Sequence, residues 1–106
     1  MLYQVESYKN DPYFALRVFP LELRANYELA AKFKGDDFLK VWKRYKNYIS
    51  DNEAISEHRQ KENLNFLTVA RKLYKAIFKR VNKEKLQKEI QALEPMIAKA
   101  WCLDKL

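Results

Sequence analysis

Residues 66–101, FLTVARKLYKAIFKRVNKEKLQKEIQALEPMIAKAW, decide the fold because they carry two apolar stripes that are out of phase. At about 100° per residue, the stripe that begins at Phe66 is centred near 50° and the stripe that begins at Leu86 near 220°. One straight helix would therefore expose apolar groups on opposite sides. The pattern predicts a break near Asn82-Lys83-Glu84 and an antiparallel helix pair with both stripes facing inward. The first stripe is Phe66, Leu67, Ala70, Leu73, Tyr74, Ile77, Phe78 and Val81, and the second is Leu86, Ile90, Leu93, Ile97 and Trp101.

Turn and capping residues set the limits of the other helices. Pro20 and Gly35 enclose one helix, since proline is favoured at the first helical position and glycine just past the end. Asp36 and Asp37 begin the next helix, where the helix dipole favours acidic groups. The apolar faces of these two helices are Leu23, Tyr27, Ala30 and Phe33 in the first, and Phe38, Leu39, Trp42, Tyr45 and Ile49 in the second.

The long helix that contains the first stripe is expected to start near residue 53. Ser50-Asp51-Asn52-Glu53 indicates a helix end followed by a capping box, which places this helix from about residue 53 to Val81. Pro95 is expected to kink the last helix or to restart it. With one Gly and three Pro in 106 residues, the chain has few turns. The predicted fold class is all-α, a small bundle of four or five helices.

The N-terminal arm, residues 1–19, is rich in aromatic residues and allows two interpretations. Two alternating segments around Lys9-Asn10-Asp11-Pro12 are typical of a β-hairpin. Alternatively, residues 1–10 are extended and Asp11 caps a short helix over 12–19 that ends before Pro20. We favour the second. The whole chain, 1–106, is predicted to be one domain, with the arm followed by the bundle over 20–104.

Composition excludes several classes of protein. The chain is 48% hydrophobic and 14% aromatic, which suits a folded core and not a disordered tail. Cys102 is the only cysteine, so no internal disulfide can form and a reducing compartment is the simplest expectation. We find no pattern of a signal peptide and no apolar run of membrane-spanning length. A cytoplasmic location, or a nuclear one in a eukaryote, is expected by default.

The positive charge of the chain is concentrated in residues 71–88. This segment holds eight Lys or Arg and one Glu, whereas the rest of the chain holds thirteen basic and thirteen acidic residues. Such a local excess is typical of a polyanionic partner, and the alternative is a solvated helix face. Five of the cations fall opposite the first apolar stripe and span about 18 Å of helix at about 1.5 Å per residue. The candidate nucleic-acid-binding residues of this face are Arg71, Lys72, Lys75, Lys79 and Lys83, with Arg80 on its flank.

A second, weaker basic face is expected on the helix that follows Asp37. Its cations are Lys40, Lys43 and Arg44, and Asp36 and Asp37 partly offset their charge. Tyr48 is the one aromatic residue there that we expect to be available for stacking on a base, since the other aromatic side chains are in phase with the core.

The sequence predicts no catalytic centre and no cofactor. His58 and Cys102 are single residues of their type, too few for a common zinc site, and the single Gly excludes a glycine-rich phosphate loop. We expect His58 to be solvated and able to pair with Glu62, and Cys102 to be a buried or inert thiol.

The functional hypothesis is therefore a non-enzymatic accessory protein that contacts a nucleic-acid backbone, DNA or RNA. Lysine outnumbers arginine in the basic segment, which favours contact with the backbone over reading of the bases. The alternative is an adaptor or inhibitor that docks its basic helix on an acidic protein. The chain could act as a homo-oligomer or as a subunit of a larger complex. Docking on an anionic membrane is disfavoured because the apolar face of the basic helix is expected in the core.

Overall fold

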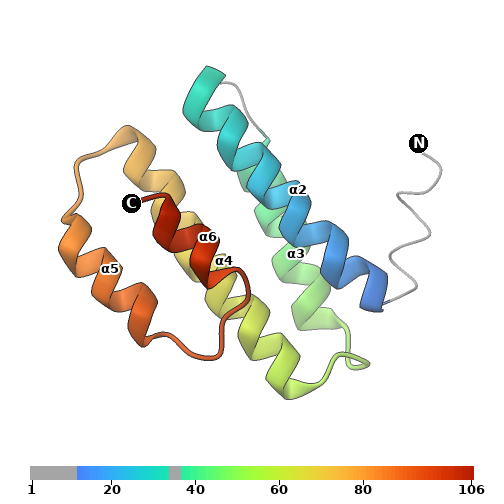
Figure 1. The fold of residues 1–106 in the computed structure, drawn as a ribbon. Helices are drawn as coiled ribbons and strands as arrows, with labels where there is room; N and C mark the ends of the chain where they lie inside the picture. Colours follow the sequence, from blue (N-terminus) through green and yellow to red (C-terminus); the bar gives the residue numbers. More distant parts are fainter. Residues whose placement is uncertain (1–11, 34–36) are drawn as a thin grey trace. The chain divides into compact units, whose positions relative to one another are not determined.

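The computed structural model describes residues 12–33 and 37–106 and is all-α, as predicted. These ranges contain five helices and no strand: α2 (Pro12–Phe33), α3 (Phe38–Asp51), α4 (Glu57–Phe78), α5 (Lys83–Ala92) and α6 (Lys99–Asp104) (Figure 1). Residues 1–11 of the predicted arm lie outside the described residues. Residues 12–19 are helical, as the favoured interpretation predicted, so the β-hairpin, whose second strand would occupy them, is wrong.

Contacts divide the chain into two compact units, a first unit up to Tyr45 and a second unit from Lys46 to Leu106. The boundary falls within α3. The assignment of residues 1–106 to one domain stays a prediction.

In the first unit, α2 runs without interruption through Pro20, so the expected helix end before this residue is wrong. Proline removes one backbone hydrogen bond from a helix interior and normally kinks or ends the helix. Here the buried residues before and after Pro20 recur every three or four positions, so the same face stays buried on both sides of it. Burial of that face stabilises the continuous helix. Its members are Ala15, Phe19, Leu23, Tyr27 and Ala30.

The first half of α3 belongs to the same unit. Phe19 on α2 stacks against Tyr45 on α3, with ring centroids 5.2 Å apart and planes inclined by 11°. Phe38 is buried as predicted, whereas Leu39 is 48% exposed and Val41 is buried in its place. The predicted stripe was thus displaced at one position, because Val41 lies one turn before Tyr45 and fits the buried face better.

In the second unit, α4 starts at a different place from the one predicted. Ser56, not the segment Ser50–Glu53, caps α4: its Oγ accepts a hydrogen bond from the Arg59 amide at 3.3 Å. Asn52 instead forms a turn, with its Oδ1 accepting from the Ala54 amide at 3.0 Å. Asn and Asp side chains form such turns readily and so compete with a helix start.

The predicted break between the two apolar stripes is confirmed. The long helix α4 ends at Phe78, three residues before the predicted end, and Asn82 caps α5 by accepting a hydrogen bond from the Lys85 amide at 3.1 Å. Figure 1 shows α5 returning in the direction opposite to α4. Leu86 and Ile90 are buried. Polar residues at the chain reversal therefore coincide with the change of apolar phase.

The last helix, α6, packs against both α4 and α5. Trp101 meets Phe66 of α4 edge to face, with ring centroids 6.2 Å apart. The segment before α6 is also tied to α4, because Asn65 Nδ2 donates to the Pro95 carbonyl at 2.7 Å. The chain restarts as a helix after Pro95, one of the two predicted outcomes, and Cys102 is buried as expected.

Tyr45 generates a prediction about alkaline stability. Burial raises the pKa of its phenol far above the usual 10.0, and the nearby Arg24 opposes part of this shift. Since the unfolded chain loses the proton first, stability is retained below pH 10 and lost as the pH rises further. Urea unfolding between about pH 9 and 11.5 measures the free energy of unfolding of the wild type and of Tyr45→Phe. This free energy should fall less steeply with pH in the variant, by up to about 1.4 kcal/mol per pH unit. Parallel curves would contradict burial of Tyr45.

Candidate functional site

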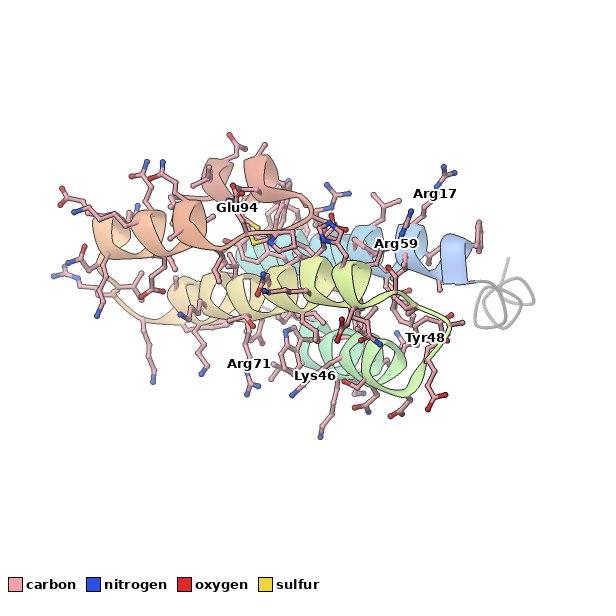
Figure 2. All side chains as sticks on the ribbon, turned by 90° about the horizontal axis from the view of Figure 1, so that it is seen from below. Arg17, Lys46, Tyr48, Arg59, Arg71 and Glu94 are labelled. Atoms are coloured by element: carbon pink, nitrogen blue, oxygen red, sulfur yellow. The ribbon has the colours of Figure 1, made fainter. Side chains whose placement is uncertain are left out.

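The cations of the predicted basic face lie where the chain turns from α4 to α5. Residues 71–88 are named here the lysine-rich turn. Arg71, Lys72 and Lys75 lie on α4, Lys79 and Arg80 in the connection, and Lys83 at the start of α5. All six are exposed. Lys85 and Lys88, which were not among the predicted binding residues, are exposed as well. The side chain of Arg71 extends outward from α4 in Figure 2.

Because α4 ends at Phe78, these cations do not share the face of one helix. The backbone of Lys79 is extended, with φ −138° and ψ 151°, and Lys83 belongs to a helix of opposite direction. The predicted residues therefore lie around one reversal of the chain and do not form a straight row along one helix. A polyanion that follows this surface would meet cations from two helices and their connection.

One ion pair crosses between the two helices. Lys72 Nζ lies 2.7 Å from Glu89 Oε2, which joins α4 to α5. The hydrogen bond from Lys72 holds the pKa of the Glu89 carboxyl below its usual range, and the charges of Lys72 and Lys85 act in the same direction. Glu89 follows the basic segment by one residue and was not singled out from the sequence. Part of the charge of Lys72 is thus neutralised within the fold.

A hollow of about 250 Å³ opens beside this ion pair. Three lysines and one carboxylate contribute to its wall, so its charged groups sum to a positive charge. Val81 and Leu86 add apolar surface. The arrangement can accept an anionic group that carries an apolar part. Its lining residues are Lys72, Lys75, Val81, Asn82, Lys85, Leu86 and Glu89.

An exposed aromatic ring lies within the lysine-rich turn. Phe78 is 53% exposed, and Tyr74 supports it edge to face with ring centroids 5.3 Å apart. The apolar pattern had placed Phe78 in the core, but the buried part of the stripe ends at Leu73. Its position between Lys75 and Lys79 was the available signal, since bases stack on exposed aromatic rings flanked by cations.

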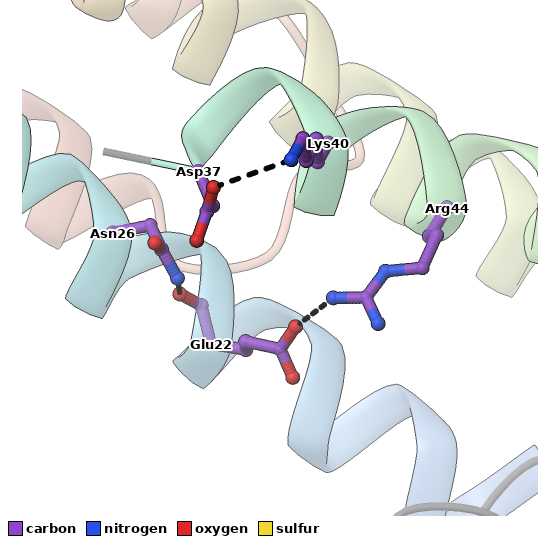
Figure 3. Close-up of polar contacts among 5 residues, drawn as sticks. All are labelled: Glu22, Asn26, Asp37, Lys40 and Arg44. Atoms are coloured by element: carbon purple, nitrogen blue, oxygen red, sulfur yellow. Dashed lines mark hydrogen bonds and ion pairs between the residues drawn. The ribbon is translucent and has the colours of Figure 1, made fainter. Parts of the chain in front are cut away.

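The second basic face is largely paired. Arg44 forms an ion pair with Glu22 of α2, and Lys40 Nζ lies 3.8 Å from Asp37 Oδ1 (Figure 3). Lys43 is exposed and Tyr48 is half-buried. Since two of its three cations meet a carboxylate, this face attracts a polyanion less strongly than the lysine-rich turn.

The exposure of His58 agrees with the expectation from the sequence. His58 is exposed, with its Nε2 3.6 Å from Glu62 Oε1. Residues 12–33 and 37–106 contain no group of three or more His, Cys, Asp or Glu side chains that could hold a metal ion. None of the helices in the described part of the chain is both long and apolar enough to cross a membrane.

Comparison with protein-family models, with curated proteins and with solved structures finds no match to this chain.

The ion pair between the two helices gives a titration test. We expect the Glu89 carboxyl, followed by NMR, to titrate below the usual value of 4.5. In Lys72→Met the midpoint should move up toward this value, because the hydrogen bond and the neighbouring charge are gone. As the folded pKa is depressed, the contribution of this pair to stability is present above about pH 4.5 and lost as the pH falls through the folded value. An unchanged midpoint in Lys72→Met would contradict the pairing.

Proposed function

We propose that this protein is a non-enzymatic accessory protein that contacts the backbone of a nucleic acid through the lysine-rich turn. The observation that carries the proposal is the separation of charge: the chain has a net charge of +7, and residues 71–88 account for all of it. A cytoplasmic location, or a nuclear one in a eukaryote, belongs to the proposal because nucleic acid is present there.

The exposed cations supply the binding energy in this proposal. Lys75, Lys79, Arg80 and Lys83 form no ion pair with any residue in the described ranges. Cations that are not paired within the protein can neutralise phosphates and release the counterions condensed on them. This release is independent of sequence, and lysine binds phosphate as a point charge. We therefore expect affinity without marked sequence preference.

A charge-reversal pair tests the proposal. Lys75→Glu with Lys79→Glu should abolish binding of a labelled oligonucleotide in fluorescence anisotropy, because two phosphate contacts are replaced by repulsion. The matched control is Lys46→Glu with Lys61→Glu, two exposed lysines outside both basic faces that lower the net charge equally. The control should weaken binding only slightly. Equal losses in both variants would indicate an effect of net charge alone, and undiminished binding in the first would remove the proposal.

Phe78 predicts a preference for single strands. Stacking of an unpaired base is worth about 1–3 kcal/mol. Phe78→Ala should therefore weaken binding of single-stranded DNA or RNA by about fivefold or more and leave duplex binding nearly unchanged. Phe33→Ala, which removes a ring that is 71% exposed on another helix, is the control. The same loss for duplex and single strands would rule out stacking on Phe78.

The hollow beside Glu89 favours a second candidate function, docking of an acidic protein segment. Its lysines suit carboxylates, and Val81 and Leu86 suit an apolar side chain of the same segment. Polyglutamate and oligonucleotides of equal charge, tested in parallel, distinguish the two candidates. A stronger response to the oligonucleotide supports nucleic-acid binding, and a stronger response to polyglutamate supports the acidic protein partner.

A further inference from the structure

Helix α2 carries a second apolar stripe on the side opposite its buried face. Phe14 is 46% exposed, Leu21 58% and Leu29 44%. Val18 is half-buried and Ala25 exposed between them. These five residues recur at intervals of three or four, so they line one face along most of the helix. The face is separate from the buried one that contains Phe19 and Leu23.

Such a face is unusual in a helix that is already packed on one side. A surface helix normally has polar residues opposite its buried stripe, and contiguous exposed apolar surface marks an interaction site. With 22 residues, α2 extends about 33 Å at about 1.5 Å per residue. That length suits side-by-side packing with another helix.

The stripe is complementary to itself when two copies are antiparallel. Pairing about position 23 places the large Leu21 against the small Ala25 of the second copy, and the reverse contact forms by symmetry. Large-against-small contacts let helices approach closely. Arg17 and Glu28 lie on the same flank of the stripe. In this register Arg17 of one copy lies beside Glu28 of the other copy, and the two-fold axis generates a second such pair. Arg17 is exposed, and its side chain extends away from α2 in Figure 2.

We propose that two copies of this chain associate through an antiparallel pairing of their α2 helices. The charges favour a second copy over an unrelated partner, because each pairing brings together two Arg17–Glu28 pairs without any further protein. Two-fold dimers are also the commonest assemblies of identical chains. A face of one helix is smaller than the roughly 800 Å² per partner of a standard interface, so we expect a dimer that dissociates at micromolar concentration. Each copy brings one lysine-rich turn, which allows bivalent contact with one polyanion.

Analytical ultracentrifugation over about 2–300 μM tests the association. The wild type should pass from monomer to dimer in this range. Leu21→Glu, which places a charge at the centre of the stripe, should weaken association at least tenfold. Leu39→Glu, the same substitution at a leucine that is 48% exposed on α3, should associate as the wild type does. A wild type that stays monomeric at the highest concentration, or equal losses in the two variants, would overturn the proposal.

The orientation has its own test, which also serves if Leu21→Glu does not fold. Arg17→Glu should weaken the dimer by repulsion, and Arg17→Glu with Glu28→Arg should restore it. Under oxidation, a mixture of Leu21→Cys and Ala25→Cys chains should form mixed disulfide dimers, whereas Leu21→Cys alone should not. Cross-linking of Leu21→Cys alone would indicate parallel pairing and overturn the antiparallel arrangement. The native Cys102 is buried and should not interfere.

Discussion

The end of α4 is the constraint on which the second unit depends. The apolar phase changes between Val81 and Leu86, and the second stripe can be buried only if the chain reverses there. This reversal falls inside the densest run of positive charge in the sequence. Folding therefore gathers cations from two helices at one turn, at an electrostatic cost that the Lys72–Glu89 pair offsets in part. Folding alone would favour fewer like charges at a turn, and this is why we propose a polyanionic partner for it.

The helical fold could be predicted from the sequence because apolar periodicity reports the path of the backbone over many residues. The break before α5 followed from the change of apolar phase between the two stripes. The positions of individual helix ends were harder to predict from the sequence. Ser56 and the segment Ser50–Glu53 both offer capping side chains, and in the structure Ser56 caps α4 whereas Asn52 forms a turn. Pro20 was expected to begin a helix, but the buried face on both sides of it stabilises one continuous helix.

The basic residues of the candidate site could be predicted from the sequence, whereas the roles of its aromatic and acidic residues could not. The lysines could be named from the sequence because their segment holds eight basic residues and one Glu, whereas the charges of the rest of the chain cancel. The exposure of Phe78 and the pairing of Glu89 could not be predicted, because they depend on where the core ends and on which residue of α5 faces α4. The second basic face illustrates the converse: Glu22, which neutralises Arg44, is 22 positions away in the sequence and becomes a neighbour only in the fold.

The two candidate interaction surfaces of this chain differ in their chemistry. The lysine-rich turn lies in the second unit, and the apolar stripe from Phe14 to Leu29 lies in the first. Electrostatic attraction acts over about 10 Å at moderate salt and tolerates many geometries, whereas an apolar helix face requires close contact. The two surfaces therefore suit different tasks, contact with a polyanion in one case and assembly of the protein in the other.

The most direct test of the central claim is the salt dependence of nucleic-acid binding by the wild-type protein. Fluorescence anisotropy of labelled duplex DNA, single-stranded DNA and RNA at about 50 and 200 mM salt measures it. The account predicts binding at the lower salt that falls steeply, with a slope of log K against log salt near −4 to −5 on duplex DNA for about five phosphate contacts. No binding of any of the three at about 50 mM salt would contradict it.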